Sequence, residues 1–142
     1  MKIGGFIMFL SYLTDSNKEG FLKICVYAAL SNEIFAEEEK DTLYAYCREM
    51  NVQVHIPEIS ESFEQLLEEL KTSTTQKERN IIVLETLALI KSDGIYDDKE
   101  QSFMASLVSG LNVSKATFEK FNKLLEKYTE IGKEMYEAII EE

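Results

Sequence analysis

Two ten-residue segments of this chain are apolar on almost every side of a helix. They are residues 21–30 (FLKICVYAAL) and 81–90 (IIVLETLALI). A helix that is hydrophobic all round has to be covered by other helices, so the two segments predict a central helix pair inside an all-α fold. The single Pro and six Gly of the chain agree, because a many-stranded sandwich needs more turn residues. The length of 142 residues suits one domain with one sizeable core.

Amphipathic helices are predicted around this pair. In residues 60–70 apolar side chains recur every three or four positions, with a glutamate stripe on the other side. The apolar face holds Phe63, Leu66, Leu67 and Leu70, and the stripe holds Glu61, Glu64 and Glu68. A C-terminal helix over residues 114–140 repeats the pattern, with Ser114 as its N-cap and Gly132 as a point that can bend it. Its apolar positions are Phe118, Phe121, Leu125, Tyr128, Ile131, Met135 and Ile139.

Two short segments depart from this pattern. Residues 52–56 alternate like a strand, but Pro57 follows at once, so we expect an extended connector instead of a sheet. Residues 3–13 are apolar and follow Lys2, yet no small-residue cleavage pattern comes after them. They are also shorter than the about 20 apolar residues that span a bilayer. A short buried N-terminal helix is therefore expected, and membrane association is disfavoured.

An internal repeat organises these helices. Residues 31–52 and 92–113 align without a gap at an offset of 61 residues. Identical pairs are Ser31/Ser92, Ile34/Ile95, Glu39/Glu100, Asn51/Asn112 and Val52/Val113. The two all-apolar segments directly precede the two copies. The sequence therefore predicts one domain over residues 1–142 in which two three-helix repeats, at about 5–52 and 60–113, are related by pseudo-twofold symmetry around the central pair, with the C-terminal helix added.

The second copy contains a recognisable motif. Residues 92–100 (SDGIYDDKE) end one apolar helix and open another, and they resemble the A-D-G-x-x-x-x-x-E signature of TerB-like domains. That family is named after a tellurite-resistance protein, and the resemblance extends over about residues 20–125. It implies a duplicated helical domain associated with stress response, phage defence, membrane-linked complexes and divalent-metal sites, with no established catalysis. The first copy departs from the signature, since Asn32 and Glu33 stand where Asp-Gly is expected.

The acidic loop of the second copy has two interpretations. Four carboxylates within eight residues attract a hard cation such as Ca²⁺ or Mg²⁺, the one cofactor that the sequence suggests. The candidate metal ligands are Asp93, Asp97 and Glu100, with Asn32, Glu33 and Glu39 as the degenerate counterpart in the first copy. Alternatively, Asp97 is a helix N-cap, Glu100 completes a capping box, and Gly94 ends the preceding helix. The sequence leaves both interpretations open.

The residue inventory disfavours an enzyme. The one histidine, His55, lies in the connector with no neighbouring Cys or His in the sequence. A Gly-rich phosphate loop, HExxH, GxSxG and CxxC are all absent from the sequence. Cys25 and Cys47 fall inside apolar helical patterns, where a reduced thiol acts as a small hydrophobe, which predicts a cytoplasmic protein.

The net charge of −11 argues against nucleic acid or an anionic membrane as partner. The acidic excess is concentrated in residues 33–41, 58–69 and 93–100. The leading hypothesis is a non-catalytic TerB-like module for protein interaction or stress response, with a contact surface that combines an apolar patch and an acidic rim. The alternative is an acidic inhibitor or decoy whose residues 58–69 bind a basic protein. A membrane-associated subunit anchored by residues 3–13 is a third hypothesis, and the oligomeric state stays open.

Overall fold

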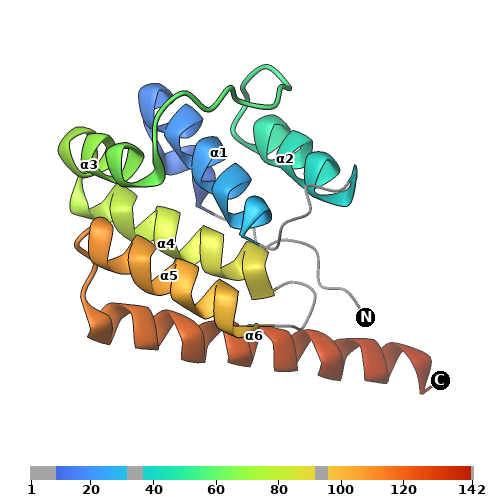
Figure 1. Cartoon of the computed structure of the whole chain (residues 1–142). Helices are drawn as coiled ribbons and strands as arrows, with labels where there is room; N and C mark the ends of the chain where they lie inside the picture. The colour runs from blue at the N-terminus through green and yellow to red at the C-terminus, as the bar shows by residue number, and fades with distance from the viewer. Residues whose placement is uncertain (1–8, 32–36, 92–95, 142) are drawn as a thin grey trace.

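The computed structural model describes residues 9–31, 37–91 and 96–141, and within these ranges every regular element is helical. Six α-helices are present in this part of the chain (Figure 1). They are α1 (Asp15–Leu30), α2 (Glu37–Glu49), α3 (Phe63–Ser73), α4 (Gln76–Lys91), α5 (Asp98–Gly110) and α6 (Lys115–Ile140), preceded by the single 3₁₀ turn η1 (Leu10–Tyr12). The all-α prediction is confirmed, and residues 52–56 form no strand.

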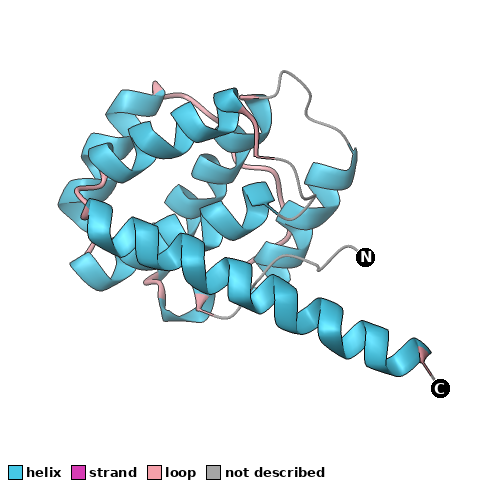
Figure 2. Cartoon of the chain, turned by 90° about the horizontal axis from the view of Figure 1, so that it is seen from below, coloured by secondary structure: helices cyan, strands magenta, loops and turns pink. Residues whose placement is uncertain are grey.

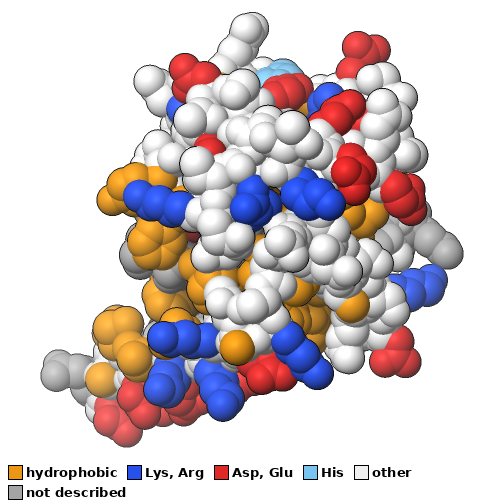
Figure 3. All heavy atoms as spheres, turned by 90° about the vertical axis from the view of Figure 1, so that its left-hand side faces the viewer, with side chains coloured by type: hydrophobic (Ala, Val, Ile, Leu, Met, Phe, Trp, Pro, Cys, Tyr) orange, Lys and Arg blue, Asp and Glu red, His pale blue; other side chains and the backbone are white. Residues whose placement is uncertain are grey.

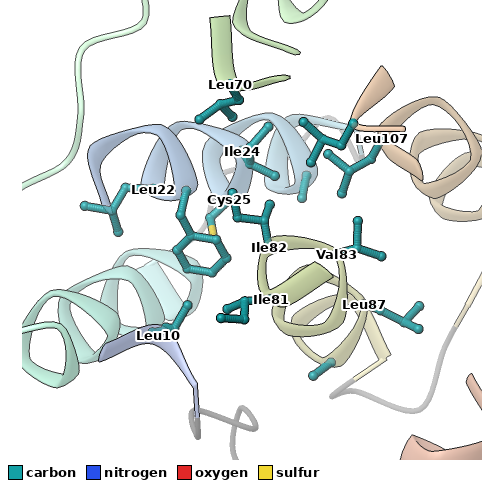
Figure 4. Packing of buried hydrophobic residues seen from close by; sticks show 14 of the residues in the cluster. Leu10, Leu22, Ile24, Cys25, Leu70, Ile81, Ile82, Val83, Leu87 and Leu107 are labelled. Carbon is teal, nitrogen blue, oxygen red and sulfur yellow. The ribbon is translucent and has the colours of Figure 1, made fainter. Parts of the chain in front are cut away.

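The core lies between α1 and α4. Nine of the sixteen residues in each helix are buried, which confirms that the two all-apolar segments are interior helices. Ile24 and Cys25 of α1 lie close to Ile82 of α4 (Figure 4). The other helices surround this pair: α2 and α3 pack on α1, α5 packs on α3 and α4, and α6 packs on α4.

The helix bounds keep the offset of 61 residues found in the sequence. Helices α1 and α4 are both sixteen residues long, and their first residues are 61 positions apart. Helices α2 and α5 are both thirteen residues long, and their first residues have the same separation. Asn51 and Asn112, which follow α2 and α5, both adopt a left-handed backbone, with φ of 57° and 55°. Asn tolerates this conformation at a helix C-terminus. The same position therefore ends both helices in the same way.

The first helical segment is shorter than the sequence predicts. A buried helix was expected over residues 3–13, but within residues 9–13 only the turn η1 forms, and residues 3–8 lie outside the described part. Thr14 then takes an extended backbone and serves as the N-cap of α1, which ends the turn. Leu10 and Leu13 are buried, so the segment still contributes to the core. Its backbone is tied to α4, because the Phe9 N–H donates to Glu85 Oε1 at 3.2 Å.

Helix α3 begins later than expected, and this changes the glutamate stripe. Its N-cap is Ser62, whose Oγ accepts the Gln65 N–H at 3.1 Å, so residues 60–62 belong to the connector. The apolar face is confirmed, with Leu66, Leu67 and Leu70 buried. Glu61, in contrast, is not part of an exposed stripe. Its side chain is only 10% exposed, and its Oε2 lies 3.1 Å from Lys23 Nζ. A hydrogen bond from its own backbone amide, together with the Lys23 ammonium, lowers the pKa of Glu61.

The connector between α2 and α3 is fixed to α1 by side-chain contacts. His55 Nε2 lies 2.7 Å from Glu19 Oε2, and His55 Nδ1 lies 2.7 Å from the Gln53 carbonyl oxygen. Nearer to α3, the Tyr27 hydroxyl donates to the Glu61 carbonyl oxygen. These contacts hold the extended chain against the helix pair without forming a strand.

We expect the pKa of His55 to lie above 6.5, because the Gln53 carbonyl and the Glu19 carboxylate both favour the protonated ring. Its stabilising contribution is then complete below pH 6.5 and is lost as the pH rises through the raised pKa. An NMR titration of the imidazole protons measures this pKa directly. Glu19→Gln should lower it, and a value at or below 6.5 in the unmodified protein would contradict the contact.

Candidate functional site

Asp97 and Glu100, two of the predicted metal ligands, form a capping box at the start of α5. Asp97 Oδ1 accepts the Glu100 N–H at 2.8 Å, and Glu100 Oε1 accepts the Asp97 N–H at 3.1 Å. Glu100 is buried, at 4% exposure. The capping prediction is therefore confirmed, and each carboxylate already satisfies a backbone N–H that the helix leaves open.

The remaining predicted ligands cannot be added to this pair. Asp93, Asn32 and Glu33 lie outside the described residues, and so does Gly94, while Glu39 lies in α2 without a described side chain. Within residues 9–31, 37–91 and 96–141, no group of three or more His, Cys, Asp or Glu side chains is arranged to hold a metal ion. The cation site at Asp93, Asp97 and Glu100 stays a prediction from the sequence.

A shallow depression of about 460 Å³ lies beside the start of α5. Its walls come from α3, α5 and the residue after α1, and they combine stacked aromatic rings with serine hydroxyls. Phe63 and Phe103 stack with their ring centroids 5.1 Å apart. The other lining residues are Ser31, Asp98, Lys99, Ser102 and Ser106. Small-molecule sites enclose most of their ligand, so this open form fits a contact area better than a substrate pocket.

The nucleophile candidates are placed unfavourably for catalysis. Cys25 and Cys47 are both buried and carry free thiols. Burial, together with Glu85 and Cys47, raises the pKa of Cys25 well above its usual range, so the reactive thiolate is scarce at neutral pH. Cys47 Sγ contacts the His55 carbonyl oxygen at 3.6 Å, whereas both ring nitrogens of His55 contact Gln53 and Glu19. The side chains therefore do not form a Cys–His pair.

The most prominent surface feature is the C-terminal half of α6. The first half packs on α4, with Leu125 buried and Phe118 and Phe121 partly buried against the core. Beyond Leu125 the helix extends past the ends of the other helices (Figures 1 and 2). There it leaves large apolar side chains 40–70% exposed. Together with Leu124 they form what we name the α6 face: Leu124, Tyr128, Ile131, Met135, Tyr136, Ile139 and Ile140.

The charges around the α6 face are mostly acidic. Glu130 and Glu137 lie on the other side of the same helix, Glu134 lies along one edge of the α6 face, and all three are exposed. In Figure 3 the far end of α6 is at the lower left, with hydrophobic side chains on its upper side and acidic ones below. An apolar patch with acidic residues beside it is the combination that the sequence led us to expect of a contact surface; that it binds a partner stays a prediction.

The sequence pattern puts Tyr128, Ile131, Met135 and Ile139 on one stripe but does not show that they are exposed. The length of the helix is the feature that could have indicated this exposure. At 1.5 Å per residue, the 26 residues of α6 measure about 39 Å, against about 24 Å for the 16 residues of α4 on which it packs. One end of such a helix has to extend past its support.

Comparisons of the chain with protein-family models, with curated proteins and with solved structures find no match. Across the described residues, no helix has both the length and the hydropathy needed to cross a membrane. Function is therefore inferred from the chain's own geometry, which defines an all-helical domain with an exposed amphipathic helix end.

Proposed function

We propose that this chain is a non-catalytic protein-interaction module that binds through the α6 face. The observation that carries the proposal is the exposure of three neighbouring large side chains, Ile131 at 53%, Met135 at 60% and Ile139 at 70%. They lie on successive turns of one helix. Contiguous apolar patches of this kind are uncommon on proteins that act alone, and they are typical of surfaces that another protein covers.

The energetics favour a protein partner. Burial of apolar surface stabilises a complex by roughly 25 cal/mol per Å², so a few side chains of this size supply several kcal/mol before the costs of association. The flexible Met135 adapts to the shape of a partner. Charged groups of both signs lie beside the apolar side chains, among them Lys127 and Glu134, so a partner with complementary charges at the edge of its surface would be favoured.

We further infer that α1–α2 and α4–α5 are two copies of one unit, as the repeat in the sequence predicts. Three buried residues of each second helix, and the buried residue that follows it, support this inference at the same offset: Leu43, Tyr46, Cys47 and Met50 correspond to Met104, Leu107, Val108 and Leu111. Asn17 and Glu78 are also equivalent, and they contact each other, as equivalent residues near a pseudo-twofold axis would. In the first copy α2 is followed by the connector, so α6 is the added element, and it carries the exposed face.

The resemblance of residues 92–100 to TerB-like domains also predicts a binding module without catalysis, in agreement with this proposal. The acidic decoy is less well supported than the α6 face, because Glu61 is engaged by Lys23 and residues 58–69 do not present one continuous acidic stripe.

Site-specific photocrosslinking in the native cells tests the proposal. A photoreactive amino acid at position 135 should give discrete adducts with protein, because Met135 lies at the centre of the α6 face. The matched control is position 137, one turn or less away on the acidic side of the same helix, where adducts should be much weaker. Equal labelling at both positions, or labelling at neither, would show that the α6 face is not a binding surface.

A further inference from the structure

We propose that the partner on the α6 face is the α6 face of a second copy of this chain, packed antiparallel about a twofold axis. The inference rests on the proposed function, since it names the partner for the same surface. It follows from the spacing of apolar and charged residues along α6 and from the exposed area.

The apolar residues of α6 follow a heptad pattern suited to pairing of two helices. Positions 121, 124, 128, 131, 135 and 138 recur at alternating steps of three and four residues, and they are Phe121, Leu124, Tyr128, Ile131, Met135 and Ala138. Such a seam packs knobs-into-holes against another helix with the same spacing. In the antiparallel arrangement Leu124 lies against the partner's Met135, and Tyr128 lies against the partner's Ile131. The small Ala138 then lies against the exposed part of the partner's Phe121, a ring that is partly buried on its own core.

The charges beside this seam determine its direction. Lys120, Lys127, Glu134 and Glu141 follow one another at steps of seven residues along one edge, and all four are exposed. In the antiparallel register given above, Lys127 lies opposite the partner's Glu134, and Lys120 lies opposite the partner's Glu141. The twofold axis repeats both pairs, so the edge is complementary to itself. A parallel pair would instead place these charges beside the apolar edge formed by Leu125, Gly132 and Ile139.

The exposed area of the seam suits a modest dimer. Its four exposed large side chains, Leu124, Tyr128, Ile131 and Met135, are 40–60% exposed, which amounts to roughly 400 Å² per protomer, about half of the 800 Å² per partner in a standard interface. Leu125, on the apolar edge beside the seam, is already buried on the body. The seam is therefore the part of the helix left for a second copy.

Sedimentation equilibrium on the full chain tests the dimer. The unmodified protein should be dimeric, and Met135→Glu should make it monomeric without loss of helical circular dichroism, since Met135 is exposed at 60%. Glu134→Lys should weaken the dimer roughly tenfold, because it places two lysine pairs where two opposite-charge pairs were. The double variant Lys127→Glu/Glu134→Lys restores opposite charges in the antiparallel register, and its affinity should return to within about twofold of the unmodified protein.

Other outcomes overturn the inference. A monomer at all concentrations up to about 1 mM excludes the second copy as partner. If position 135 of that monomer still crosslinks to a different protein, the proposed interaction module is supported and the proposed dimer is excluded. A dimer that Met135→Glu leaves intact would show that the two copies pair through another surface, and it would exclude the α6 face as the dimer interface. Failure of the double variant to recover affinity excludes the antiparallel register. Slow hydrogen exchange of residues 131–140 in a monomer, made fast by deletion of residues 2–8, would identify the chain's own N-terminus as the occupant.

Discussion

Glu78→Gln is expected to lower the free energy of unfolding by about 3 kcal/mol at pH 7. The carboxylate is 6% exposed and lies where the start of α1 meets the start of α4. Glutamine keeps the size of the side chain but replaces one acceptor oxygen with an NH₂ group. Several donors that now share a carboxylate would then face a neutral amide, and at least one would lose its acceptor.

Glu78 accepts hydrogen bonds from two helix starts at once. Its Oε2 accepts the Thr14 N–H at 3.0 Å, the Thr14 hydroxyl at 3.1 Å and the Asn17 side-chain amide at 3.0 Å. Its Oε1 accepts the Thr75 N–H at 3.2 Å, while the Glu78 N–H donates to Thr75 Oγ1 at 3.2 Å. The residue therefore completes the capping box of α4 and also satisfies the cap of α1.

The same contacts predict how stability depends on pH. Burial by itself raises the pKa of Glu78, but the hydrogen bonds from Thr14, Asn17 and Thr75 outweigh burial and lower the pKa from 4.5 to about 2. A carboxylate with a lowered pKa stabilises the fold fully above pH 4.5, and this stabilisation is lost as the pH falls toward 2. The difference in stability between the unmodified protein and the Glu78→Gln variant should therefore be largest at neutral pH and shrink progressively below pH 4.5.

Urea denaturation of both proteins at pH 7, 5 and 3 measures this effect. Glu64→Gln is the matched control, because Glu64 is an exposed glutamate in the first turn of α3. It should change stability by no more than about 0.5 kcal/mol. An equal loss for Glu64→Gln and Glu78→Gln, or a Glu78→Gln effect that is the same at pH 3 and pH 7, would contradict the contacts described.

Local contacts in this chain were predictable from the sequence, and contacts between distant segments were not. The capping box of Asp97 and Glu100 joins residues three positions apart, and the spacing alone predicted it. Thr75 and Glu78 have the same spacing and could have been found by the same rule. The link from Glu78 to Thr14 crosses 64 residues, and only the packing of α1 against α4 produces it.

Burial presents a similar limit at the candidate site. The apolar stripe of α6 has the same periodicity whether it covers the body or faces outward, so the pattern identified Ile131 and Met135 without showing their exposure. Glu61 shows the opposite case. It has the spacing of an exposed helical glutamate, but the helix begins two residues later and Lys23 lies within reach.

The second large effect is expected where α3 packs on α1. Leu70→Ala should lower the free energy of unfolding by about 3 kcal/mol, because Leu70 is 3% exposed and the smaller side chain leaves a cavity. In the Leu70→Ala protein, the effect of Gly20→Ala on stability should also change sign, from destabilising to stabilising. A Cβ at Gly20 would lie 2.5 Å from Leu70 Cδ2, so Gly20→Ala forces the buried Leu70 side chain out of its position and should cost about 1–2 kcal/mol. Once Leu70 is replaced by alanine, the added methyl group enters the cavity, and Ala is the better helix former by about 1 kcal/mol.

Four proteins form the test, each measured by urea denaturation: unmodified, Gly20→Ala, Leu70→Ala and the double variant. Gly110→Ala supplies the matched control, since its Cβ would lie 2.4 Å from Leu67 Cδ1 and does not approach Leu70 as closely. Gly110→Ala should therefore stay destabilising in the Leu70→Ala protein, whereas Gly20→Ala becomes stabilising there. Stabilisation by Gly20→Ala in both backgrounds would mean that Leu70 does not set the distance between α1 and α3. The expected reversal would instead show that position 20 requires glycine because Leu70 of α3 packs closely against it. That contact excludes alanine, although alanine is the better helix former.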